Sequence, residues 1–211
     1  MLELVKVFPA FFLTAFLLAV VPGQGVAMVL RQCLVGGKRP AIYSVLGNSG
    51  GLLIWGAASG IGLSAIFAKS PTAFNILKYA GVTFLLFLSI QTLFELRKEF
   101  GKFDFQSNVP KNFKPAFRIG LITNLTNVKA AVFAVAFIPQ FVPRDFNLGL
   151  GIFILSGVQT IASMSWYLSL IFAVDKASVF LAKPRVRKIL TAISALGILF
   201  LALGLLLTKP R

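Results

Sequence analysis

Six stretches of mainly apolar residues constrain the fold of this chain more than any other feature. About 20 residues of α-helix cross the roughly 30 Å hydrocarbon layer of a bilayer. Lipid offers the backbone no hydrogen-bond partners, so such stretches cross it as helices. The sequence therefore predicts an all-α membrane protein with six transmembrane helices. The predicted spans are Val7–Leu30, Ile42–Phe67, Leu77–Leu96, Phe117–Phe137, Leu148–Val174 and Ile189–Leu207.

The N-terminal part of the first stretch allows a second interpretation. Val7–Val21 is apolar enough for the core of a signal peptide. However, Glu3 disturbs the basic region that such peptides need, and Pro22–Gly25 makes a poor cleavage site. We therefore expect this segment to remain in the protein as a helix.

Composition excludes several kinds of site chemistry. The chain is 57% hydrophobic, with one cysteine, Cys33, and no histidine. An internal disulfide, a Cys/His zinc site and a Ser-His-Asp triad are therefore excluded. The six acidic residues lie outside the middle of every predicted helix, which disfavours a buried carboxylate site for a divalent metal. We expect no cofactor and, without a nucleophile–base pair, no enzymatic activity.

The formal charge of +15 would suggest nucleic-acid binding in a soluble protein. In a membrane protein, an excess of Lys and Arg marks the cytoplasmic loops. The loops after the first, third and fifth predicted helices carry fourteen of these residues, and the opposite side carries six. The charge pattern thus predicts a multi-pass protein of the plasma (inner) membrane, with both termini outside and no nucleic-acid partner. A re-entrant first segment would instead leave five spans and one terminus on each side.

The longest polar stretch divides the chain into two groups of three helices. We expect a single transmembrane domain over residues 1–211, with one half at 1–96, a cytoplasmic linker at 97–116 and a second half at 117–211. Because each half has three helices, the halves face opposite ways, which is the arrangement of an inverted repeat in secondary transporters.

The first helix of each half is interrupted by residues that disturb a helix. Pro22 removes a backbone donor, and Gly23 and Gly25, on either side of Gln24, let a ligand approach the backbone. The free N–H groups of a helix that restarts there would favour an anion. A simple packing kink is the alternative. The corresponding interruption in the second half is Asn124–Asn127.

Lys129 follows this second interruption and precedes a long apolar run. A charge inside a membrane span is costly and points to a functional site. Its ammonium suits a carboxylate, while the amides of Asn124 and Asn127 can bind either pole of a zwitterion. The alternatives are a lysine that reaches water near a helix end and asparagines that join helices.

Two further helices carry small or polar residues. In the second helix, the pairs Gly47/Gly51 and Gly56/Gly60 favour close helix packing, and the amide of Asn48 is the candidate there for substrate contact. The fifth helix has a polar stripe that either lines a path or bonds to its own backbone. The stripe is Ser156, Thr160, Ser163 and Tyr167.

Several of these segments resemble the LysE/RhtB family of amino-acid exporters. The resemblance covers most of residues 8–97 and 117–143, and the last two helices are generic. Gln24 and Val128 stand where the family usually has proline, and Asn48 and Phe133 stand near places where some members have aspartate. The segments that carry the resemblance are Pro22–Arg31, Gly36–Ala41, Leu46-Gly47, Ser70–Gly81, Asn124–Ala130 and Phe137–Phe141.

The resemblance implies a plasma-membrane efflux protein for amino acids or related small zwitterionic solutes, driven by the proton gradient. In this hypothesis, Lys129 and the N–H groups near Gly23–Gly25 hold the substrate carboxylate, and Asn124 and Asn127 meet its ammonium. The alternatives are a cation or metal efflux protein and a non-transporting structural membrane protein. The expected partners are the small-molecule substrate and the lipid bilayer, and the sequence leaves a homo-oligomer open.

Overall fold

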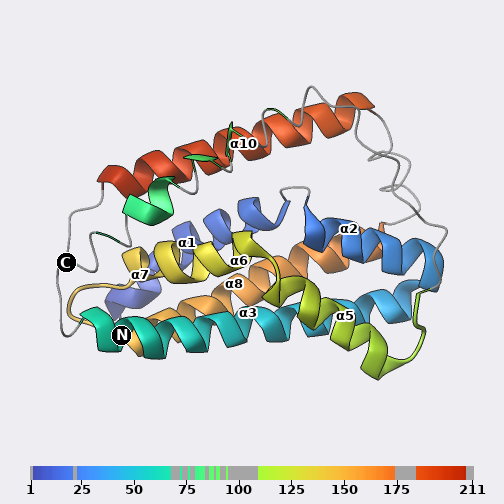
Figure 1. The fold of residues 1–211 in the computed structure, drawn as a ribbon, viewed down its shortest axis with the longest axis horizontal. Helices are drawn as coiled ribbons and strands as arrows, with labels where there is room; N and C mark the ends of the chain where they lie inside the picture. Colours follow the sequence, from blue (N-terminus) through green and yellow to red (C-terminus); the bar gives the residue numbers. More distant parts are fainter. Residues whose placement is uncertain are drawn as a thin grey trace.

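The protein is described here by a computed structural model that covers residues 2–20, 23–67, 72, 76, 79–83, 86–87, 89–90, 94, 109–173 and 184–207. All regular structure in these residues is helical (Figure 1). The elements are α1 (Leu2–Val20), α2 (Gln24–Arg31), the π-helix η1 (Gln32–Gly36), α3 (Lys38–Phe67), α5 (Phe113–Leu125), α6 (Val128–Val132), the π-helix η2 (Phe133–Phe137), α7 (Ile138–Phe141), α8 (Leu148–Phe172) and α10 (Pro184–Leu207).

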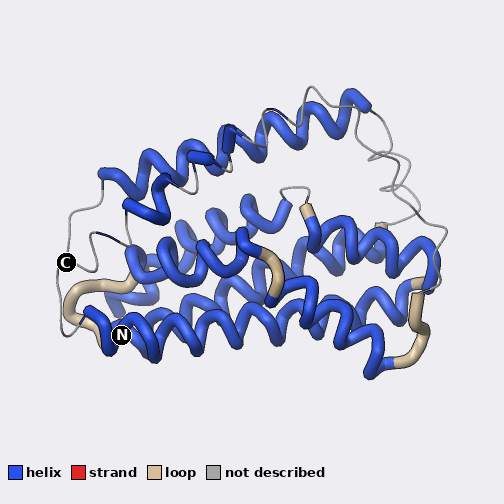
Figure 2. The backbone as a smooth tube through the Cα atoms, in the orientation of Figure 1, coloured by secondary structure: helices blue, strands red, loops and turns tan. Residues whose placement is uncertain are grey.

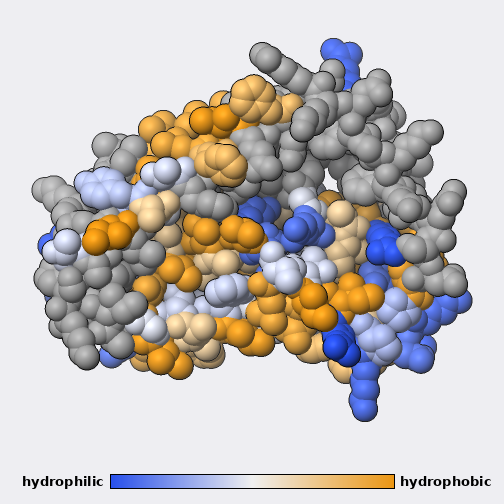
Figure 3. All heavy atoms as spheres, viewed as in Figure 1, coloured by the Kyte–Doolittle hydropathy of each residue, from blue (hydrophilic) through white to orange (hydrophobic). Residues whose placement is uncertain are grey.

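Several of the described helices suit a membrane. α1 and α8 are each long and apolar enough to cross one, and α5 together with Val128–Phe141 forms a third such unit that is bent by 59°. Apolar side chains also cover much of the visible face of the molecule (Figure 3). The predicted all-α membrane protein is thus confirmed at the level of class.

Most predicted spans coincide with helices, with small differences at their ends. The fourth begins at Phe113 rather than Phe117, so the last residues of the expected linker are helical. Pro115 favours this early start because its fixed φ suits the first turn of a helix. Pro22, half of the residues of Leu77–Leu96 and residues 97–108 of the linker lie outside the described residues.

α3 packs between α5 and α8 through small residues. A Cβ added to Gly47 would overlap the Phe117 carbonyl oxygen of α5, and one added to Gly56 would overlap the Ser156 side chain of α8. Ser44 Oγ also donates a hydrogen bond to the Ala116 carbonyl oxygen across the α3–α5 contact, at 2.9 Å. The paired glycines of α3, Gly47/Gly51 and Gly56/Gly60, therefore serve close helix packing, as their spacing predicts.

The contacts of α3 fix the direction of its neighbours. Gly51 lies against Asn124, and Ser59 Oγ donates to the Ala134 carbonyl oxygen at 2.8 Å, so α5 and η2 run parallel to α3. Along α8 the order reverses, because Gly60 lies against Gly149 and Gly56 against Ser156. α8 is therefore antiparallel to α3.

The buried apolar residues form two clusters. One includes Phe11 of α1, Phe133 of η2 and Leu155 of α8. The other includes Val29 of α2, Val45 of α3 and Ile171 of α8. The two interruptions, after α1 and after α5, both fall near the middle of the long axis (Figure 2).

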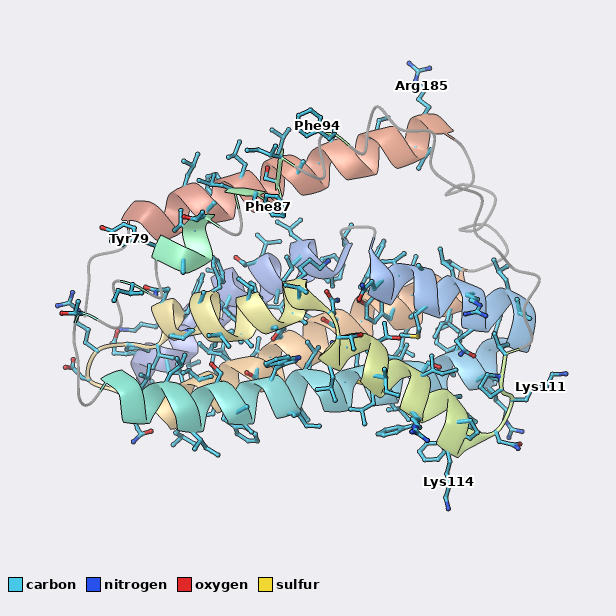
Figure 4. The ribbon with its side chains drawn as sticks, viewed as in Figure 1. Tyr79, Phe87, Phe94, Lys111, Lys114 and Arg185 are labelled. Carbon is cyan, nitrogen blue, oxygen red and sulfur yellow. The ribbon has the colours of Figure 1, made fainter. Side chains whose placement is uncertain are left out.

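Basic residues gather at one end of the molecule. Lys111, Lys114 and Arg185 extend from this end (Figure 4), which is strongly hydrophilic in Figure 3. The basic residues of the three basic loops whose side chains are described as exposed include Arg31, Lys38, Arg39, Lys111, Lys114, Arg118 and Arg185. The opposite end, where α1 begins and α8 begins, has Lys6 in an ion pair with Glu3, and Arg144 beside Asp145 in the sequence.

Candidate functional site

The first interruption separates α1 from α2. α1 ends at Val20, and Gly23 caps α2 in an extended conformation, with no side chain satisfying the first turn of α2. Gly25 lies against the hydroxyl of Tyr167 on α8, which would overlap any Cβ at this position. Gly25 thus permits the close approach of α8, while Gly23 and Gln24 are exposed at the interruption.

The second interruption separates α5 from α6. Thr126 Oγ1 donates back to the Ile122 carbonyl oxygen at 2.8 Å, which closes the end of α5. Asn127 then caps α6, because its Oδ1 accepts a hydrogen bond from the Lys129 backbone N–H at 3.1 Å. Asn127 therefore has a local structural role, which leaves its NH2 group for other partners.

The side chain of Lys129 joins the two interruptions. Its Nζ donates a hydrogen bond of 3.1 Å to the carbonyl oxygen of Leu18, which is 111 residues away in the sequence. Leu18 belongs to the last turn of α1, where carbonyl groups have no partner within the helix and carry the negative end of its dipole. A part-buried ammonium from α6 thus binds the C-terminal end of α1.

Asn124 and Asn48 lie in the interface between α3 and α5. Each side chain is only 2% exposed. The Oδ1 atom of Asn124 is buried and has no hydrogen-bond partner among the described residues. Because an unpaired buried polar atom is costly, Asn124 is a candidate to bind a ligand.

The polar stripe of α8 is largely satisfied within its own helix. Ser156 Oγ donates to the Ile152 carbonyl oxygen and Thr160 Oγ1 to the Ser156 carbonyl oxygen, each at 2.8 Å. For these two hydroxyls, the structure favours bonding to the backbone over lining a path. Tyr167, as described above, packs against Gly25.

The sequence reasoning missed Gln159, which lies among the stripe residues of α8. Its side chain is 3% exposed, and its Oε1 atom has no hydrogen-bond partner in the described part of the chain. The indole N–H groups of Trp55 and Trp166 are also buried and unpaired there. A glutamine in the middle of an apolar span is the sequence signal that could have indicated this position.

The fold and these sites define a class of protein. Two interrupted helices that meet around buried, unpartnered polar groups are typical of membrane translocators. Comparison with protein families identifies the particular family. The chain matches the family of LysE type translocators over residues 16–209 and belongs to this family.

Curated relatives agree with this assignment. A homoserine/homoserine lactone efflux protein of Salmonella typhimurium is 32% identical, over 96% of each chain. A leucine efflux protein of the same species is 29% identical, over 75% of this chain and 74% of the relative. An uncharacterized membrane protein of Bacillus subtilis, YrhP, is 28% identical, over 90% of this chain and 93% of the relative. No solved structure matches the chain.

Proposed function

We propose that this protein is a secondary transporter that exports amino acids or related small zwitterionic solutes across the plasma membrane. Its family and the names of its efflux relatives support this class of substrate. The observation that carries the proposal is the hydrogen bond between Lys129 Nζ and the Leu18 carbonyl oxygen. It brings a membrane-embedded cation to the end of an interrupted helix, where a carboxylate can take the place of the carbonyl oxygen.

The proposed binding mode uses both interruptions. The substrate carboxylate binds the Lys129 ammonium and the uncapped N–H groups at the start of α2, near Gly23–Gly25. The unpaired Oδ1 of Asn124 accepts a hydrogen bond from the substrate ammonium. Asn48 and the NH2 group of Asn127 complete the polar surroundings. The two halves then rock about this site to expose it to each side in turn.

The proposed architecture is one transmembrane domain of six helices, built as two inverted halves. Two features of the described residues support it. In each half an interrupted helix restarts and then passes into a five-residue π-helix, η1 in the first half and η2 in the second. The basic residues of three loops also share one end of the molecule (Figure 4). We propose that this end is cytoplasmic and that both termini are outside.

Uptake into inverted membrane vesicles tests the proposal. Vesicles that contain the protein should accumulate radiolabelled homoserine or leucine when a proton gradient is imposed, and vesicles without the protein should not. A divalent cation serves as the competing substrate. Transport of the cation without either amino acid would favour a cation efflux protein, and transport of none of the three would contradict the proposal.

A further inference from the structure

We propose that Gln159 of α8 is a substrate-binding residue that acts with Asn124, and that the site selects solutes with a carboxylate and no net positive charge. This inference rests on the proposed transport of amino acids. It adds a residue from the fifth predicted helix to the site and a rule for substrate charge.

Gln159 and Asn124 lie at the same height in the bundle, on helices that flank α3. Asn124 lies against Gly51, and Ser156 lies against Gly56, five residues further along α3. Since α8 is antiparallel to α3, Gln159 is displaced from Ser156 by about 4.5 Å toward the level of Gly51, at 1.5 Å per residue. The two amides therefore lie within about 3 Å of one level along α3.

Lys129 lies in the adjoining section of the bundle, between the levels of Gly51 and Ser59. Lys129 falls between Asn124, which lies against Gly51, and Ala134, whose carbonyl oxygen accepts the hydrogen bond from Ser59. Three polar side chains from α5, α6 and α8 thus lie along one section of α3, from Gly51 to Ser59. The interruption after α1 joins them through the bond from Lys129 to Leu18.

The unpaired atoms have complementary chemistry. Asn124 Oδ1 and Gln159 Oε1 are buried acceptors without a partner in the described residues, and the Trp55 indole N–H is a buried donor without one. Trp55 is on α3 between Gly51 and Gly56, at the same level. Leaving such groups unpaired costs free energy, which a bound solute with an ammonium and a carboxylate would recover.

Charge limits which solute fits. Segments 7–67, 109–144 and 146–173 contain no Asp or Glu in the sequence, so the helices that form this level bring no carboxylate to it. A zwitterion places its carboxylate on Lys129 and its ammonium on the two amide oxygens. A solute with a second ammonium adds a charge that nothing there neutralises, and in a low-dielectric site this is unfavourable.

Two labelled probes test this charge rule in inverted vesicles. The first is whichever of homoserine and leucine the wild-type protein transports faster, and the second is lysine, which carries one more positive charge. We expect a KM for lysine at least about tenfold higher than for the neutral probe. Equal KM values for the two probes in the wild-type protein would overturn the charge rule.

Substitutions at Gln159 test its role. Gln159→Leu should raise the KM for the neutral probe by about tenfold. The matched control is Ser165→Ala, because Ser165 is exposed on the same helix and its hydroxyl donates to the Ile161 carbonyl oxygen of that helix. Gln159→Glu supplies the missing anion and should reduce the preference for the neutral probe over lysine by about tenfold.

Asn124→Asp replaces the other amide by a carboxylate and should shift the preference between the two probes in the same direction. This variant serves as the test if a Gln159 variant does not fold. An unchanged preference in folded Gln159→Glu and Asn124→Asp, or an unchanged KM in folded Gln159→Leu, would overturn the inference. Neither result would affect the proposed function, which fails only if the wild-type protein moves no amino acid.

Discussion

At the scale of single residues, Lys129 has an unusual environment for a charged side chain. It is a charged side chain in the first turn of α6, where the helix dipole disfavours a cation. The Leu18 carbonyl oxygen at the end of α1 offsets this, because that end of a helix favours a cation. The same geometry that stabilises the ammonium keeps it beside the interruption where we propose that substrate binds.

Replacement of Lys129 distinguishes a role in substrate binding from a role in holding the structure together. Lys129→Met keeps the length of the side chain and removes its charge, so we expect transport to fall at least about tenfold, as for the loss of a charge-assisted hydrogen bond. The amount of folded protein should change little, because a buried charge in lipid is itself costly. Transport by Lys129→Arg should lie between that of the wild-type protein and that of Lys129→Met, since a planar guanidinium does not fully replace an ammonium. Transport rates per folded molecule measure both effects.

Normal transport by Lys129→Met, at normal abundance, would mean that Lys129 only joins α1 to α6 and does not bind substrate. A loss of folded protein in the Met variant but not in the Arg variant would lead to the same conclusion.

At the scale of elements, helix interruptions and glycine contacts decide how closely the helices approach. Gly25 of α2 and Tyr167 of α8 meet at one such contact, and Gly120 of α5 and Ser44 of α3 meet at another. None of these glycines needs a positive φ, because Gly37 alone has one among the described residues. These positions need a small residue because the neighbouring helix lies so close. Substitution by alanine, which adds a single methyl group, tests this need.

The contact between α2 and α8 predicts a coupled pair of substitutions. Gly25→Ala should reduce transport, because the new methyl group would overlap the Tyr167 hydroxyl and displace α8 from the interruption. Tyr167→Phe removes that hydroxyl and should partly restore transport in the double variant, since the ring carbon still lies 3.1 Å from the added Cβ. A double-variant cycle of transport rates measures the coupling. Strictly additive effects would show that the two residues act independently.

The contact between α3 and α5 predicts a loss of stability. In Gly120→Ala the new methyl group would overlap the Ser44 carbonyl oxygen, so the helices must separate, at a cost of about 1–3 kcal/mol in unfolding free energy. Gly157→Ala is the matched control, because no described atom lies within 4 Å of its Cβ position. Thermal unfolding in detergent measures both. Equal midpoints would mean that the interface accommodates the methyl group.

At the scale of the whole molecule, the positions of the basic residues agree with the directions in which the helices run. The start of α5, the start of α10 and the junction between η1 and α3 bring their basic residues to one end. This end faces the cytoplasm in our proposal, since Lys and Arg in short loops are retained on that side.

Cysteine labelling tests this orientation. In a protein whose natural Cys33 has been replaced by Ala, Ser107→Cys in the basic linker should not react with an impermeant thiol reagent added to intact cells. Asp145→Cys, at the opposite and exposed end, should react. Labelling of Ser107→Cys alone would invert the proposed topology, and labelling of both would contradict the assignment of these loops to opposite sides.

The sequence by itself determined the class of protein and the positions of the two interruptions. Spans can be predicted because the transfer of an apolar segment into lipid depends on that segment's own composition. Interruptions can be predicted because Pro and Gly act on the adjacent backbone, as at Pro22–Gly25, and because Asn and Thr side chains bond to nearby backbone groups, as at Asn124–Asn127. The sequence could not supply the partner of Lys129 or the burial of Gln159. The bond from Lys129 to Leu18 joins residues 111 positions apart, and the unpaired Gln159 oxygen depends on how α8 packs against α1 and α3. Such contacts are decided by tertiary packing, because they depend on which helix faces meet.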